Sequence, residues 1–200
     1  TNKNHGRYEM LHKNRLRNPL HTNLRDYTSI EDYFKQCDTD VRTSFRKCQN
    51  KGYEIKELTS IGAEESAQLY DIWTSSSTRQ GRQINMVYED LKLNLLPVNK
   101  DQWPVKEYSL PLVFYALYMD GVIVGYLELL FEGDYAIVHS TMGHKNYLKF
   151  GIMKTLFFEV IKLNWGKINR LIYGPEKSSS HFKNDLRINK IENNRANWIQ

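Results

Sequence analysis

The sequence lacks the short motifs by which many enzyme classes are recognised. It contains no HExxH zinc motif, no Walker-type phosphate loop, no GxGxxG fingerprint and no Ser-His-Asp order. We also find no set of His, Cys, Asp and Glu with metal-ligand spacing, and we expect no metal site. Any chemistry must therefore be argued from less specific patterns.

Cysteine and long apolar runs are also scarce. The only cysteines are Cys37 and Cys48, which lie in helical patterns without a CxxC partner, so we expect reduced thiols. No apolar run approaches the roughly 18 residues of a membrane-spanning helix. The start of the chain shows no signal-peptide pattern. These observations together predict a cytoplasmic protein.

What is present is an ordinary globular composition with a mildly basic charge. The 200 residues are 40% hydrophobic and 26% charged, which is enough apolar material for a real core. The net charge of +5 favours acidic partners, although lysines dispersed for solubility explain it equally well. We expect a basic N-terminal arm over 1–23 and a single domain over 24–200.

Periodicity and turn residues predict an α/β (α+β) fold. Ser29 and Gly52 mark the start and the end of one or two helices. The turns Asp120-Gly121 and 132–134 link three hairpin strands. The strands are expected at 53–58, 110–119, 122–131, 135–143 and 168–174, and the other helices at 62–77, 85–95, 148–165 and 178–187. The segment from Tyr135 to Tyr173 should form a right-handed parallel crossover.

The stretch 144–162 carries an unusual charge pattern. Its second half has the spacing of an amphipathic helix, but its start holds Gly151 and three lysines, Lys145, Lys149 and Lys154. Lysine at a helix N-terminus opposes the helix dipole, whereas the free amides there bind anions. A bound polyanion would explain the pattern, and a plain loop with solvated lysines is the alternative.

The order of elements and this loop resemble the GNAT superfamily of N-acyltransferases. In that family three strands lead into a loop of the form Q/R-x-x-G-x-G/A, whose amides hold the pyrophosphate of acyl-coenzyme A. The matching stretch here is "LKFGIM", in which Gly151 takes the first glycine position, while Leu148 and Met153 replace the usual residues. The resemblance implies a GNAT-like mixed central sheet flanked by helices, with an N-terminal helical extension. It also implies that the third and fourth strands part near Met142.

Three stretches are closer to the Fem-like branch of that superfamily. They are "DVRTSFRKCQNKGYEIKEL", "FGIMKTLFFEVIKLNWGKINRLIYG" and "HFKNDLR", and they resemble a helix before the first strand, the loop with its helix and strand, and a motif on the last helix. Many Fem-like proteins are two such domains in tandem and move amino acids from aminoacyl-tRNA to peptidoglycan precursors. The resemblance therefore implies tRNA as an alternative donor.

The resemblance to acyltransferases also implies where the donor, acetyl-CoA or another acyl-CoA, is bound. Backbone amides near Ser140 to Met142 would polarise the thioester carbonyl, and the following loop would hold the phosphates. The residues assigned to donor binding are Thr141, Met142, Gly143, Lys145, Lys149, Phe150, Gly151, Ile152, Met153 and Lys154. For Phe150, stacking on a base and helix packing are both consistent with its spacing.

Acyl transfer to an amine needs a proton acceptor and a hydrogen-bond donor for the oxyanion. The candidate catalytic residues are His139, His144, Glu128 and Ser140, because histidine titrates near neutrality and Glu128 can act through water. Alternation along the strand places His139 with Thr141 on one face and Ser140 on the other. In the alternative, these side chains only pack or face solvent.

A second basic stretch is "WTSSSTRQGRQI", where Arg79 and Arg82 flank Gln80 in a hydroxyl-rich loop. Two arginines this close suit a carboxylate or phosphate, and a plain surface loop is the alternative. Because the corresponding region borders the acceptor cleft in GNAT enzymes, we assign Arg79, Gln80 and Arg82 to substrate binding. The expected activity is acyl transfer from acyl-CoA to an amine acceptor. A Fem-like transferase and a non-catalytic binding module are the alternatives.

Overall fold

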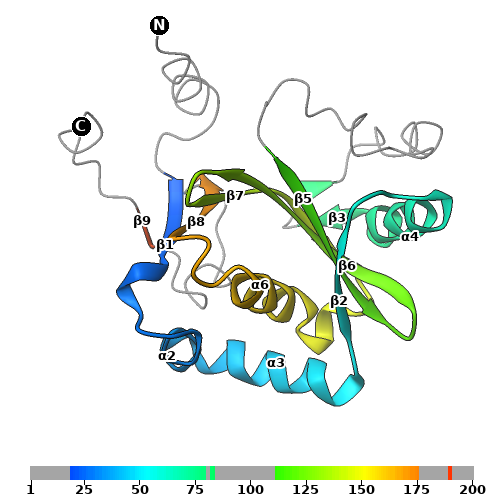
Figure 1. The fold of residues 1–200 in the computed structure, drawn as a ribbon. Coiled ribbons are helices and arrows are strands. Elements are labelled where there is room, and N and C mark those ends of the chain that lie inside the picture. Colours follow the sequence, from blue (N-terminus) through cyan, green and yellow to red (C-terminus); the bar gives the residue numbers. More distant parts are fainter. Residues whose placement is uncertain (1–18, 80–81, 84–110, 176–188, 191–200) are drawn as a thin grey trace, which may run out of the picture.

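The protein is described here by a computed structural model that covers residues 19–79, 82–83, 111–175 and 189–190. The helices predicted at 85–95 and 178–187, together with Gln80, lie outside these residues. The described elements form a seven-stranded mixed sheet with helices on both faces (Figure 1). The strand order is β2-β5-β6-β7-β8-β1-β9. The predicted mixed α/β fold is confirmed.

Two helices precede the central strands, as predicted. In α2 (Ile30–Gln36) the Ser29 hydroxyl accepts the Asp32 N–H at 3.1 Å, which satisfies one of the free amides at the helix start. Helix α3 (Thr39–Lys51) is capped by the Asp38 carboxylate and ends at Gly52. Gly52 has φ 72°, a value that glycine adopts without a Cβ penalty.

Four strands follow, each antiparallel to its neighbour in the sheet. They are β2 (Glu54–Leu58), β5 (Leu112–Met119), β6 (Val122–Glu132) and β7 (Tyr135–Gly143). Asp120 and Gly121 both have positive φ, the geometry of the tight turn predicted between β5 and β6. Along the chain, the segment from β2 to β5 contains α4 (Ala63–Thr74) and a small hairpin of β3 (Thr78–Arg79) and β4 (Arg82–Gln83).

The crossover after β7 is parallel, as predicted, but its helix begins later than expected. A 3-10 turn, η4 (Leu148–Phe150), is followed by Gly151 with φ 77°, and α6 (Ile152–Leu163) starts beyond it. A left-handed residue cannot continue a right-handed helix, so the predicted helix from 148 is divided at Gly151. Strand β8 (Arg170–Pro175) then pairs in parallel with β7.

The far edge of the sheet contains strands that the sequence pattern did not reveal. Strand β1 (Pro19–Asn23) comprises the last five residues of the predicted arm and pairs antiparallel with β8, before the short turn η1 (Leu24–Asp26). Strand β9 (Asn189–Lys190) pairs with β1. The sequence "PLHTN" has no apolar alternation, and β8 supplies the backbone partner that makes it a strand.

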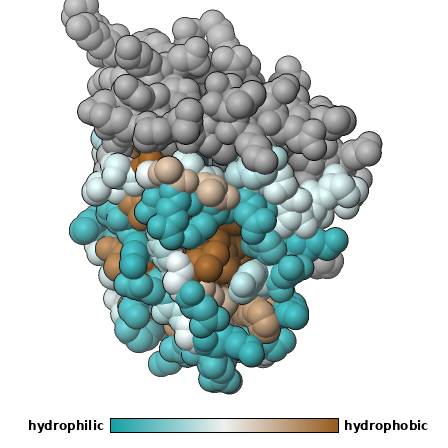
Figure 2. Space-filling view, turned by 90° about the vertical axis from the view of Figure 1, so that its right-hand side faces the viewer, coloured by the Kyte–Doolittle hydropathy of each residue, from teal (hydrophilic) through white to brown (hydrophobic). Residues whose placement is uncertain are grey.

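The sheet separates two apolar clusters, one on each face. On one face α2, α3 and α6 pack against the sheet through Tyr33, Val41, Leu156, Phe157 and Ile161. On the other face α4 packs through Leu69 and Ile72 against Phe114, Ala116, Ile123 and Tyr126. Figure 2 looks at the α4 side of the molecule, where apolar residues near the centre are framed by hydrophilic ones. None of the helices described here is long and apolar enough to cross a membrane.

Candidate active site at the split between β7 and β8

Strands β7 and β8 are paired only at their start. Tyr135–Ile137 pair with Arg170–Ile172, and β7 then continues to Gly143 alongside β6 alone among the described residues. The predicted split is present but begins at Ile137 rather than at Met142. The strand predicted at 135–143 is confirmed to its last residue, because β6 pairs with this part of β7.

A β-bulge lies directly after the split. Glu128 pairs with Ser140 and Leu129 with Val138, so His139 is an additional residue in β7. The bulge breaks the alternation of side chains, and His139 Nδ1 lies 2.7 Å from Glu128 Oε2. Ser140 shares the face of Glu128, so the predicted placement of His139 on the opposite face is wrong.

The Glu128–His139 pair has the arrangement of an oriented base. The Glu128 side chain is only 5% exposed, and that of His139 is 34% exposed. We assign the carboxylate as acceptor of the Nδ1–H, which places the basic lone pair of the ring on Nε2. A buried carboxylate needs such a partner, and it would stabilise the imidazolium formed after proton uptake.

A second polar row, formed by the hydrogen-bonded side chains of Trp73, Tyr126 and Ser140, lies beside this pair on the same sheet face. The Trp73 indole N–H donates to the Tyr126 hydroxyl at 2.9 Å, and that hydroxyl lies 3.1 Å from Ser140 Oγ. The Tyr126 ring is stacked on Phe114 with centroids 5.2 Å apart. Sequence reasoning missed Trp73 and Tyr126. The available signal was the period-two spacing of Tyr126 and Glu128 within an otherwise apolar strand.

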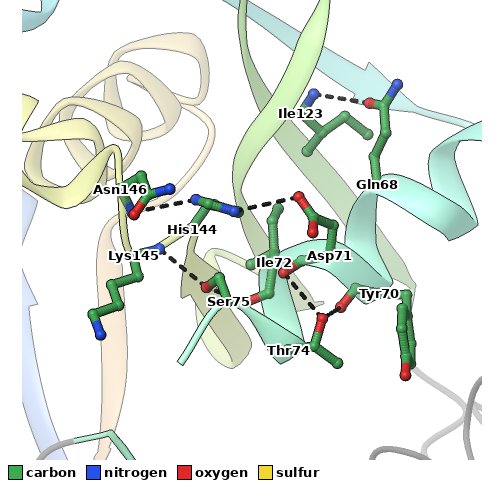
Figure 3. A network of polar contacts seen from close by, with 10 residues as sticks. All are labelled: Gln68, Tyr70, Asp71, Ile72, Thr74, Ser75, Ile123, His144, Lys145 and Asn146. Carbon is green, nitrogen blue, oxygen red and sulfur yellow. Dashed lines mark hydrogen bonds and ion pairs between the residues drawn. The ribbon is translucent and has the colours of Figure 1, made fainter. Parts of the chain in front are cut away.

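His144 lies in a different network, which links the loop after β7 to α4 (Figure 3). Its Nε2 lies 3.3 Å from Asp71 Oδ2, and its Nδ1 accepts the Asn146 N–H at 3.2 Å. The neighbouring Lys145 N–H donates to Ser75 Oγ at 3.0 Å. Because both ring nitrogens have protein partners, the geometry suits positioning of the loop better than proton transfer.

The segment 143–154, which the sequence analysis assigned to donor binding, is called the donor loop below. Its lysines differ in their surroundings. Lys154 forms an ion pair with Asp40 of α3 and is 14% exposed. Lys149 and Lys51 both place their ammonium groups near the Phe150 ring, at 5.1 and 5.2 Å from its centroid. The structure shows no ion pair of Lys149 with the described carboxylates, so its charge is the more accessible to an anionic ligand.

Some backbone N–H groups of the donor loop already donate hydrogen bonds within the protein. The N–H groups of Phe150 and Gly151 donate to Tyr147 and Leu148 carbonyl oxygens at 2.9 and 3.0 Å, and the helical ladder begins with Thr155 N–H to Gly151 O. Ile152 and Met153 occupy the first turn of α6, where amides have no intrahelical acceptor.

The remaining donor-site residues have clear packing roles. Thr141 donates its hydroxyl to the Tyr126 carbonyl at 3.0 Å, and Met142 packs against the α4-side cluster. A Cβ on Gly143 would lie 2.6 Å from Met153 Sδ, so the strand end and α6 are closely packed there. The expected loop around Arg79 and Arg82 is instead a hairpin in which these two residues are paired.

Comparison with known proteins identifies the fold. No protein-family model and no curated protein matches the sequence. Among solved structures, FemX is similar with a TM-score of 0.56 and 10% identity, over 84% of this chain and 56% of that chain. A conserved protein of unknown function from Bacteroides thetaiotaomicron has a TM-score of 0.52 and 13% identity, over 87% and 55%.

An N-acetyltransferase from Thermoplasma acidophilum, solved in complex with coenzyme A, is also similar, with a TM-score of 0.41 and 20% identity over 56% of this chain and 71% of that chain. The chain has a GNAT-like fold, and it shares that fold with FemX. It spans little more than half of FemX.

Proposed function

We propose that this protein is an N-acyltransferase that moves an acyl group from acyl-CoA to an amine acceptor. The observation that carries the proposal is the Glu128–His139 pair at the bulge where β7 and β8 part. A polar, partly buried base on a sheet face is costly for folding, and its position beside a gap in strand pairing suits a reaction site.

In this proposal His139 Nε2 takes a proton from the amine as its nitrogen attacks the thioester carbonyl. The carbon–nitrogen bond forms, the carbon–sulfur bond breaks, and the imidazolium returns its proton to the sulfur. Glu128 holds the ring through Nδ1 and stabilises its charged form. His144 keeps the donor loop in place through Asp71 and Asn146 rather than acting on the substrate.

The donor's phosphates are assigned to the start of α6. The first-turn amides of Ile152 and Met153 point along the helix dipole, and Lys145 and Lys149 add positive charge. Lys154 is not part of this proposal because Asp40 neutralises it. For the acceptor we assign Arg79 and Arg82, which are paired positions of the β3–β4 hairpin and are of the residue type that binds a carboxylate or phosphate.

The test is an acyl-transfer assay with acetyl-CoA and longer acyl-CoA donors against a panel of primary amines. We expect turnover in the wild type and a loss of about 10²-fold or more in kcat for His139→Gln, with a smaller loss for Glu128→Gln. His21→Gln, in β1, which β8 separates from β7, is the matched control and should retain full activity. Wild-type turnover by His139→Gln would disprove the assignment of the base.

The Fem-like alternative has two supporting observations. FemX covers 84% of this chain at a TM-score of 0.56, while two of the loop amides expected for a diphosphate are already used within the loop. The same assay should therefore include aminoacyl-tRNA as donor. Turnover with that donor alone would support the alternative, and turnover with neither donor would favour a binding module.

A further inference from the structure

On the α4 side of the sheet, the hydrogen bonds that link Trp73, Tyr126 and Ser140 run in one direction, toward the serine. We infer that Ser140 donates a hydrogen bond to the acyl oxygen during transfer, and that Tyr126 and Trp73 are positioning residues that orient the Ser140 hydroxyl. This inference rests on the proposed function and assigns the electrophilic half of the reaction. It concerns the serine hydroxyl and is independent of the backbone amides of the bulge.

The chemistry of the three groups sets the direction. An indole N–H can only donate, so the Tyr126 oxygen is the acceptor of the 2.9 Å bond from Trp73. Accepting that bond polarises the phenol and favours donation of its own hydrogen to Ser140 Oγ at 3.1 Å. A serine hydroxyl that accepts from the phenol directs its hydrogen away from the phenol.

The register places this donor beside the base. Ser140 is directly opposite Glu128, and His139 is the preceding residue, bonded to that same glutamate. The proton acceptor and the hydrogen-bond donor are thus consecutive residues on one face of β7. Ser140 is partly exposed, while Tyr126 beneath it is 2% exposed, so a substrate oxygen can reach the serine but not the phenol.

The Glu128–His139 pair and the second polar row perform complementary parts of one balanced step. As the amine nitrogen attacks, the carbonyl oxygen gains negative charge, and Ser140 donates a hydrogen bond to it without transferring the proton. His139 takes the proton from nitrogen. When the intermediate collapses, the oxygen becomes a carbonyl again, the sulfur leaves with the proton from His139, and Ser140 is unchanged.

The test compares Ser140→Ala, Tyr126→Phe and their double variant in the acyl-CoA assay, with Ser140→Thr as the conservative rescue. We expect Ser140→Ala to lower kcat about 10²-fold with little change in KM, the effect typical of a lost oxyanion donor. Tyr126→Phe retains the stacked ring and should lower kcat about 10-fold. The double variant should be no slower than Ser140→Ala alone, because Tyr126 acts only through the serine.

A spectroscopic measurement tests the direction separately from activity. The indole N–H resonance of Trp73, identified by its loss in Trp73→Phe, should move upfield in Tyr126→Phe and stay unchanged in Ser140→Ala.

Ser140→Thr should restore most of the rate lost in Ser140→Ala.

The outcomes separate this inference from the proposed function. Full activity of Ser140→Ala, or losses that multiply in the double variant, overturns the role of Ser140 while His139→Gln still shows whether the protein is an acyltransferase. Absence of transfer by the wild type with every donor overturns the proposed function and this inference together.

Discussion

Gly151 is constrained in two independent ways. Its φ of 77° lies in the left-handed region, and a Cβ there would lie 2.4 Å from Ser44 Cβ and 2.7 Å from Ser44 Cα. The backbone of the donor loop therefore touches α3 directly. The neighbour that leaves no room for a Cβ at this position is a helix of the protein itself.

The two constraints can be separated with a second glycine. Gly151→Ala should lower the free energy of unfolding by roughly 2–4 kcal/mol, from backbone strain and overpacking together. Gly121→Ala is the control, since Gly121 has φ 78° with no atom within 4 Å of the added Cβ, and it should cost only about 1 kcal/mol. Urea denaturation of both variants measures the difference. Equal losses would show that contact with Ser44 adds nothing.

At the scale of elements, the start of α6 combines cations with free amides. Lys149 there lies near the Phe150 ring, which does not neutralise its charge. An ammonium at a helix N-terminus is unfavourable by about 0.3–1 kcal/mol without a ligand. A diphosphate would reverse that sign, because cation, amides and dipole all attract it.

Lys149→Ala should thus preserve or raise the stability of the ligand-free protein and weaken the binding of coenzyme A. The loss of affinity should shrink as salt rises, because exposed charges are screened. Isothermal titration at two ionic strengths measures both effects. Lys167→Ala, in the turn before β8, is the control, and equal affinity of the two variants would make Lys149 a solvated surface residue.

A second connection between elements joins α4 to the donor loop. Ser75 accepts the Lys145 N–H and donates to the Ile72 carbonyl at 2.8 Å, so it bridges the end of the helix and the end of β7 (Figure 3). His144 and Asp71 form a parallel bridge. Two side-chain bridges therefore join α4 to the loop after β7.

Ser75→Ala should accelerate hydrogen exchange of the Lys145 amide, because that amide loses its acceptor. Thr74→Ala is a matched control, since its hydroxyl bonds only to the Tyr70 and Asp71 carbonyls within α4. Exchange measured by NMR should change at Lys145 in the first variant alone. Similar acceleration in both variants would indicate general fraying of α4 instead.

At the scale of the whole molecule, buried phenols link stability to high pH. Burial raises the pKa of Tyr33, Tyr115 and Tyr173 above the usual 10.0. The unfolded chain loses these protons near that pH, while the folded protein retains them. The stabilisation they provide is fully present below pH 10 and is lost as pH rises beyond it.

We expect the free energy of unfolding to fall steeply between pH 10 and 11, by about 1.4 kcal/mol per pH unit for each phenol that stays protonated only in the folded state. Tyr33→Phe should reduce this slope, since Tyr33 is fully buried. Phe34→Leu, in the same helix, should lower stability at every pH without changing the slope. Denaturant titrations at several pH values decide between them.

Local features of the chain were sufficient to predict most elements. Ser29, Gly52 and the Asp120-Gly121 turn act within a few residues of themselves, and their effects are as expected. The apolar strands bounded by turn residues, and the parallel crossover, were also predicted from the sequence. The candidate residues at the end of β7 were named from residue type and from the resemblance, and their roles stay a prediction.

The contacts of those residues were decided only by the tertiary structure. One additional residue in β7 turns His139 toward Glu128, and no pattern within the strand announces that bulge. Lys154 meets Asp40, which is 114 residues away, and its charge is thereby neutralised. Strand β1 exists because β8 offers its edge. Hydrogen bonds and ion pairs act over a few ångströms in space, so their partners depend on how the whole chain packs rather than on spacing along it.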